Sequence, residues 1–206
     1  LLRMNPLLHV ARKQQETILY NIKDGFSYVI QSNTIKYLIL KRILLTIFSS
    51  SFDTLLPKYS ETILGGGIKT YSNLLLGSGI GGLTAILFLV LYGTRIKIQN
   101  YFLFSAIVLG VSFVFLSVTS SILLCMLITF ILGGSKTLYG TLSTTLIQNF
   151  TDNIYRGRVM SIHQLIWSAS AIGSLTAGLL ANSIGLLITI GLSGTPILNR
   201  PMEFFK

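Results

Sequence analysis

Residues 71–92 and 101–118 are two apolar runs that contain no Asp, Glu, Lys or Arg. A helix needs about 20 such residues to cross a hydrocarbon layer of roughly 30 Å, where every backbone polar group must be satisfied within the segment. Further apolar runs, the first two of which contain charged residues and the last of which is short, cover residues 35–59, 121–147, 159–181 and 184–198. We therefore predict an all-α membrane protein with five full spans and a truncated sixth.

Composition agrees with this prediction. The 206-residue chain is 51% hydrophobic and 11% charged, whereas soluble domains average about 25% charged residues. The segment 1–34 differs from the rest because apolar residues recur three and four positions apart between Ile18 and Ile30. This spacing predicts an amphipathic helix on the cytoplasmic membrane surface. The predicted domains are thus a cytoplasmic linker at 1–34 and a transmembrane half-domain at 35–206.

The chain carries 16 Lys and Arg against 6 Asp and Glu, a net charge of +10. In a soluble protein this excess would indicate a nucleic-acid partner, but here the cations cluster at the ends of apolar runs, where they set membrane orientation. We predict no nucleic-acid partner and a cytoplasmic N-terminus in a bacterial inner membrane. The cations of two short loops, expected to act as cytoplasmic topology or gate residues, are Arg95, Lys97, Arg156 and Arg158.

Asp53 and Lys136 are the two charges placed clearly at hydrocarbon depth. Each costs about 2.5–3.5 kcal/mol at a helix centre on insertion scales, so each is a candidate functional residue. Asp53 lies ten residues beyond Ile43 and Lys136 eleven before Ile147, which places both at about 15–16 Å from the cytoplasmic face. We predict that they pair near the midplane and contribute to a substrate or ion site. The alternatives are a pair that only fixes helix register, a lysine that snorkels outward, and a position of Asp53 at the outer membrane interface, since the end of its span is poorly defined.

Small residues four positions apart indicate close helix contacts, because lipid offers no hydrophobic drive for helices to associate. Two such ladders, expected to pack against each other or against neighbouring helices, are Gly77 with Gly81 and Ala169 with Gly173 and Ala177.

No enzyme is predicted, and no metal or cofactor. The 6 acids, 2 histidines and 1 cysteine are scattered along the chain, and they form neither a triad nor a pair of carboxylates. Cys125 lies within an apolar run and is expected to be a packing residue. His163 is expected to be a hydrogen-bonded structural histidine, with a proton relay as the alternative.

Three stretches carry a family resemblance. The passage "TTLIQNFTDNIYRGRVMSIHQLIWSASAIGSLTAGLLA" resembles the fourth-to-fifth helix region in the C-terminal half of major facilitator superfamily transporters, most of all bacterial exporters of the enterobactin-exporter and macrolide-efflux type. The stretch "FDTLLPKYSETILGGGIKTYSNLLLGSGIGGLTA" is similar to the seventh and eighth helices of that subgroup, and "NIKDGFSYVIQSNTIKYLIL" to the linker between its halves.

The resemblance implies the C-terminal six-helix half of a twelve-helix fold, with substrate at the midplane between two halves. In that fold the first and fourth helices of each half line the cavity, which here implies Asp53 and Lys136 with Tyr139 beside them. The second and fifth spans would form part of the lateral interface. The implied activity is proton-coupled export of a small amphiphilic molecule, such as a drug or siderophore.

The sequence departs from the family pattern in lacking the first six helices and in its ending, "GTPILNRPMEFFK". The expected partners are the lipid bilayer, a small-molecule substrate, and either a missing N-terminal half or a second copy. Two alternatives stay open: a non-transporting structural or interaction subunit, and an inactive truncated remnant.

Overall fold

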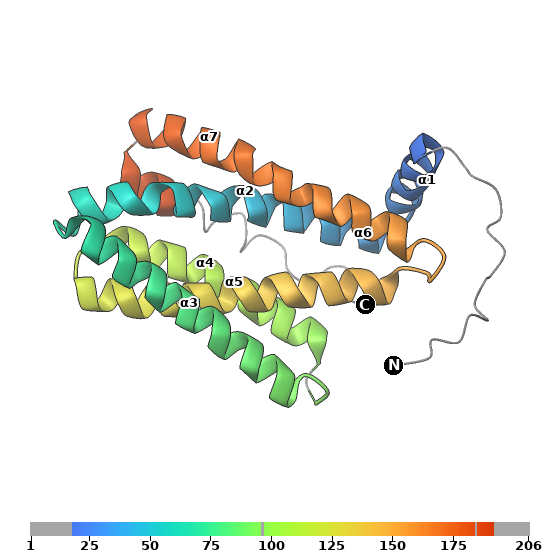
Figure 1. The fold of residues 1–206 in the computed structure, drawn as a ribbon, viewed down its shortest axis with the longest axis horizontal. Helices are drawn as coiled ribbons and strands as arrows, with labels where there is room; N and C mark the ends of the chain where they lie inside the picture. Colours follow the sequence, from blue (N-terminus) through green and yellow to red (C-terminus); the bar gives the residue numbers. More distant parts are fainter. Residues whose placement is uncertain (1–17, 96, 184, 192–206) are drawn as a thin grey trace, which may run out of the picture.

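The computed structural model describes residues 18–95, 97–183 and 185–191, and all regular secondary structure in these ranges is helical. The long helices run along the longest axis of the molecule, and the short first helix crosses one end of the bundle (Figure 1). The elements are α1 (Ile18–Gln31), α2 (Asn33–Thr62), α3 (Gly67–Tyr92), α4 (Ile98–Val118), α5 (Ile122–Phe150), α6 (Arg156–Leu165), the 3₁₀ turn η1 (Ile166–Ser168) and α7 (Ala169–Ser183).

Four helical stretches of the described chain are long and apolar enough to cross a membrane: α3, α4, α5 and the continuous stretch Arg156–Ser183. Large apolar side chains such as Leu83, Val90 and Leu91 of α3 are exposed on the outside, as expected for a surface that faces lipid rather than water. The all-α membrane fold is thus confirmed. Residues 186–191 are helical, but most of the predicted span 184–198 lies outside the described residues, so the six-helix half stays a prediction.

Helix α2 is longer than predicted and includes the first residues of a predicted loop. The sequence indicated a loop from residue 57 to 70, but the helix continues through Pro57 to Thr62, and α3 begins at Gly67. Proline removes one backbone donor and is usually a helix breaker, but α2 continues past Pro57 to Thr62, where Ser60 Oγ donates to Pro57 O at 2.7 Å. The turn that remains needs glycine, since Gly65 and Gly67 both have positive φ.

The predicted span at 159–181 is one apolar run in the sequence but three elements in the structure. Helix α6 ends at Leu165, η1 tightens the chain over three residues, and α7 resumes at Ala169. Short 3₁₀ turns of this kind mark places where the helix repeat is locally changed. The interruption therefore sets how the side chains of α6 and α7 are oriented relative to each other.

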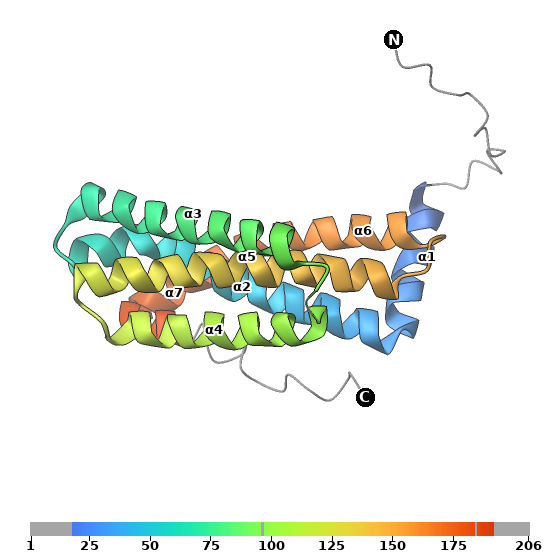
Figure 2. The same ribbon diagram turned by 90° about the horizontal axis from the view of Figure 1, so that it is seen from below.

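Helix α5 lies in the middle of the bundle and contacts α2, α3 and α4, while α7 packs on the other side of α2 (Figure 2). Glycine allows the closest of these approaches. A Cβ at Gly81 of α3 would overlap the backbone oxygen of Phe130 in α5, and one at Gly173 of α7 would overlap that of Ile47 in α2. The two small-residue ladders therefore pack against neighbouring helices and not against each other.

Candidate functional site

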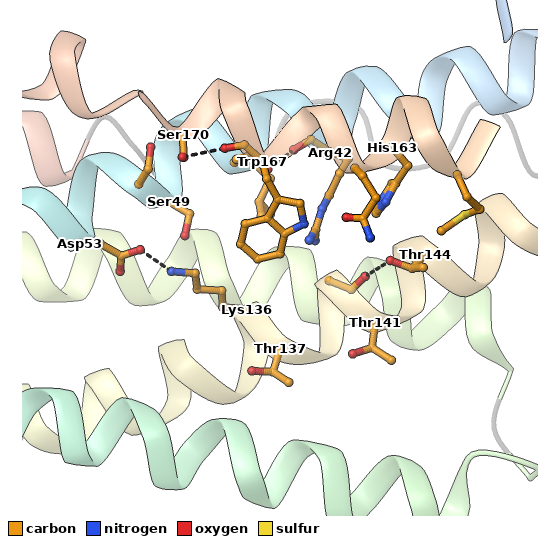
Figure 3. A pocket seen from close by; sticks show the side chains of 16 residues that line it. Arg42, Ser49, Asp53, Lys136, Thr137, Thr141, Thr144, His163, Trp167 and Ser170 are labelled. Atoms are coloured by element: carbon orange, nitrogen blue, oxygen red, sulfur yellow. Dashed lines mark hydrogen bonds and ion pairs between the residues drawn. The ribbon is translucent and has the colours of Figure 1, made fainter. Parts of the chain in front are cut away.

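Helices α2 and α5 bring Asp53 and Lys136 together, although 83 positions separate them in the sequence. Lys136 Nζ donates a hydrogen bond to Asp53 Oδ2 at 2.6 Å (Figure 3). The side chains remain 36% exposed for Lys136 and 56% exposed for Asp53. The pair lines a cavity between these helices, and its role in a substrate or ion site stays a prediction.

The cavity has a volume of about 480 Å³ and is bounded by α2, α5, α6, η1 and α7. Its size is within the range of small-molecule sites. Both members of the ion pair line it. The other polar side chains of the lining are Arg42, Thr46, Ser49, Ser50, Thr137, Thr141, Thr144, His163, Gln164, Trp167 and Ser170.

Helical periodicity explains why these residues meet. On α2, Arg42, Ser49 and Asp53 are spaced by seven and four positions, which puts them on one face. On α5, Lys136 and Gly140 follow the same four-residue rule. The sequence therefore contained the signal for Arg42, which lies on the face of Asp53, but its position near a cationic helix start led to the interpretation that it only orients the protein.

Arg42 extends into the cavity. Its guanidinium lies over Gly140, where an added Cβ would stand 2.9 Å from Nη1, so glycine leaves the room that the side chain occupies. Its Cζ is 6.0 Å from the centroid of the Trp167 ring, at the outer limit of a cation–π contact. No carboxylate of the described residues forms an ion pair with Arg42.

Two buried polar groups of the lining lack partners. His163 is 4% exposed, and neither Nδ1 nor Nε2 has a hydrogen-bond partner among the described residues. The expectation of a hydrogen-bonded structural histidine is therefore wrong. Ser49 Oγ is unpartnered in the same way, whereas Ser50 and Thr144 donate to carbonyls of their own helices. Buried polar atoms without partners are rare and call for an explanation.

Tyr139 does not join this group. It points from α5 toward α4, where its ring stacks on Phe102 with centroids 4.6 Å apart, and it is 3% exposed. It is also absent from the cavity lining. The expectation that Tyr139 lies beside Asp53 and Lys136 is wrong: Tyr139 is only about 60° from Lys136 around the axis of α5, but its ring is held against Phe102 in the packed core.

A second cluster of polar contacts lies where α1 crosses the end of the bundle. Asp24 of α1 forms an ion pair with Arg158 of α6. The Tyr28 hydroxyl donates to Asp152 Oδ2 at 3.1 Å and accepts from the Asp152 backbone N–H at 3.2 Å. The Tyr28 ring stacks on Tyr155 with centroids 4.3 Å apart. We call this group the α1 contact.

The remaining predicted gate residues lie at the same end of the bundle. Arg156 is exposed, and both it and Arg158 belong to the first turn of α6, not to the preceding bend as the sequence indicated. Arg95 and Lys97 are exposed in the connection between α3 and α4. Their role in membrane orientation stays a prediction, as does a role of Arg156 and Arg158 in gating.

Residues 1–202 match the sequence model of a major facilitator family described as transmembrane secretion effector. No curated protein and no solved structure matches the chain. The match covers nearly the whole chain, and it agrees with the apolar helices and with the resemblance noted from the sequence.

Proposed function

The chain belongs to the transmembrane secretion effector family, and on that basis we propose that it forms the C-terminal half of a secondary active transporter. The proposed activity is export of a small amphiphilic molecule, such as a drug or siderophore, in exchange for protons. The observation that carries this proposal is the Asp53–Lys136 ion pair, open to a cavity between helices of a membrane protein.

Energetics support a functional role for the pair. A charged residue at the centre of a membrane helix costs about 2.5–3.5 kcal/mol on insertion scales, so such residues persist mainly where they line ion or substrate pathways. The two charges therefore suggest a function beyond packing.

The pair also offers a chemical route to proton coupling. A proton taken up by the Asp53 carboxylate would neutralise it and leave the Lys136 ammonium without its counter-ion. The ammonium could then interact with substrate, and loss of the proton would restore the pair. Alternation of these two states is the differential interaction that coupling between two ligands requires.

Transport requires further helices that enclose the cavity on its open side. In major facilitator proteins the two halves rock around a site at the membrane midplane, so we propose that either an N-terminal half or a second copy of this chain supplies the facing helices. The proposed orientation puts α1 and the N-terminus in the cytoplasm of a bacterial inner membrane, since Arg95, Lys97 and Arg156 lie at that end.

The test is efflux by the chain joined to a matching N-terminal half, measured in cells with those small amphiphilic drugs or siderophores that the wild type exports. Asp53→Asn and Lys136→Ala should each abolish efflux, because each leaves a partner without its counter-charge. Glu61→Gln and Lys58→Ala are matched controls on α2; both side chains are exposed and lie outside the cavity lining.

The controls should export at the wild-type rate. Wild-type efflux in both Asp53→Asn and Lys136→Ala would exclude the pair as the coupling site. If the wild-type chain accumulates in membranes but shows no substrate-dependent flux in vesicles, even with its partner half, the non-transporting alternative is correct.

A further inference from the structure

We propose that the part of the cavity at Arg42 and His163 binds an anionic carboxylate group of the transported molecule. The transported compound would then be an amphiphilic organic acid. This inference rests on the proposed transport function and names the substrate class of the same cavity. It is carried by two neighbouring side chains of the lining: Arg42, which forms no ion pair with a described carboxylate, and His163, whose ring nitrogens have no partner among the described residues (Figure 3).

The charge balance of the cavity is positive. Asp53 and Lys136 compensate each other, and Arg42 adds a cation for which the described lining holds no further carboxylate. A guanidinium in a membrane protein is normally paired with an acid or with backbone carbonyls. The lining therefore presents a cation that lacks a counter-ion, and an anionic ligand would supply it.

Arg42 is directed into the cavity by its surroundings. The adjacent cation of α2, Lys41, turns the other way, and its Nζ lies 5.6 Å from the Tyr37 ring. Arg42 instead lies over Gly140, in space that any larger residue would fill. Arginine presents its donors as a planar fork that matches a carboxylate with two parallel hydrogen bonds.

His163 adds the second observation. Its ring is buried and lines the cavity, and both nitrogens lack partners among the described residues. A neutral imidazole always has one N–H donor to offer. With Arg42 it can therefore provide a set of converging donors for one oxyanion.

Trp167 supplies the apolar part of the site. It is the only tryptophan of the chain, and its ring stands in the cavity between Arg42 and Lys136 (Figure 3). Arg42 and Asp53 are eleven residues apart, or about 16 Å along α2. An amphiphile whose carboxylate meets Arg42 could thus lay its apolar body against the indole, toward the ion pair.

The same tryptophan reports on binding. We would titrate the purified full chain in uncharged maltoside detergent with 4-bromobenzoate, 4-bromobenzamide and 4-bromobenzylamine, and follow bromine quenching of Trp167 fluorescence. The three probes share size and ring but carry an anionic, a neutral and a cationic group. We expect about tenfold tighter apparent binding of the benzoate than of the amide, as one charge-assisted hydrogen-bonded contact provides, and the weakest response from the amine.

Variants of the lining residues test which side chains produce the preference for benzoate over amide. Arg42→Gln should reduce the preference for benzoate over amide to less than about twofold, while Arg42→Lys keeps part of it. His163→Phe should weaken benzoate binding and leave amide binding unchanged, which also shows that the cavity is intact. Lys41→Gln is the matched control, because it removes the same charge one position away outside the lining.

Equal binding of benzoate and amide to the wild type would overturn the proposal, as would a full preference in both Arg42→Gln and His163→Phe. Added phosphatidylglycerol tests whether a lipid headgroup is the ligand. If this lipid blocks the benzoate response at low mole fraction, the site at Arg42 and His163 binds lipid, and its assignment to the transported molecule is wrong. The measurement needs no flux, so its failure leaves the proposed transport intact. Likewise, wild-type efflux in Asp53→Asn and Lys136→Ala would exclude the ion pair as the coupling site but would leave this binding result unaffected.

Discussion

Two ion pairs in the described part of the chain each join an aspartate to a cation, but they are held in different ways. Asp24 and Arg158 at the α1 contact are accompanied by a tyrosine stack and by two hydrogen bonds to Asp152. Among the described residues, Asp53 and Lys136 have only each other as ion-pair partners, and they open onto a cavity whose neighbouring polar groups, Ser49 and His163, find no described partner.

The difference suggests a division of roles. At the α1 contact the polar groups satisfy one another, so the cluster is complete as a structural joint. The cavity pair is positioned instead by the close approach of the helices that carry it, and its surroundings leave donors and acceptors unused. Fully satisfied networks rigidify a structure, whereas unsatisfied ones mark places that bind something else.

Reversal of charge should affect the two pairs most differently. Asp53→Lys places two ammonium groups together at mid-depth, and we expect a loss of about 3 kcal/mol or more, seen as a failure to recover monodisperse protein. The double variant Asp53→Lys with Lys136→Asp should restore folding, because opposite charges face each other again. Arg158→Asp at the α1 contact should cost about 1 kcal/mol, because this half-buried pair lies at the end of the bundle and not midway along it (Figure 1). Similar losses at both sites would contradict the distinction.

Crowding of the helix contact behind the cavity is expected to have the next largest effect. A side chain at Gly173 would overlap Ile47 O and Ser50 Oγ of α2, so Gly173→Leu should separate α7 from α2 and cost about 2–3 kcal/mol. The measurement is the thermal midpoint in detergent. Gly178 of the same helix has open space around it, and Gly178→Leu should leave the midpoint unchanged or raise it. A fall of equal size in both variants would show that α7 is not held by this approach.

The α1 contact should respond to changes of its own that leave the cavity untouched. Tyr155→Ala removes the stack with Tyr28 and the ring beneath Arg158, and we expect α1 docking to weaken by about 0.5–1.5 kcal/mol. Trypsin cleavage after Lys23 reports this, because Lys23 lies within α1 and cleavage requires the helix to open. Tyr155→Phe keeps the ring and should be cleaved at the wild-type rate. Faster cleavage of the Phe variant alone would exclude the stack as the cause.

The helices could be predicted from the sequence because the bilayer imposes a simple rule. The charge-free runs at 71–92 and 101–118 fall within α3 and α4, and the error lies at element ends and breaks, such as the extension of α2 through Pro57 and the division at η1. Apolar character alone contains no signal for the continuation of α2 past a proline or for the 3₁₀ turn.

The site was only partly predictable from the sequence, and the predictions that failed have one cause in common. Asp53 and Lys136 could be placed at one depth because the helix rise per residue is constant. The burial of Tyr139 against Phe102, the turn of Arg42 into the cavity and the lack of partners around His163 depend on how each helix is rotated about its axis.

What the amino-acid sequence by itself determined is therefore the position of each residue along the membrane normal: which segments can cross, how deep each charge lies, and which residues are small enough for close contact. The tertiary structure alone decided which residues face each other. Depth follows from a fixed rise within one helix, whereas facing depends on side-chain packing between helices that lie far apart in the chain, such as Gly173 against Ile47 and Arg42 over Gly140.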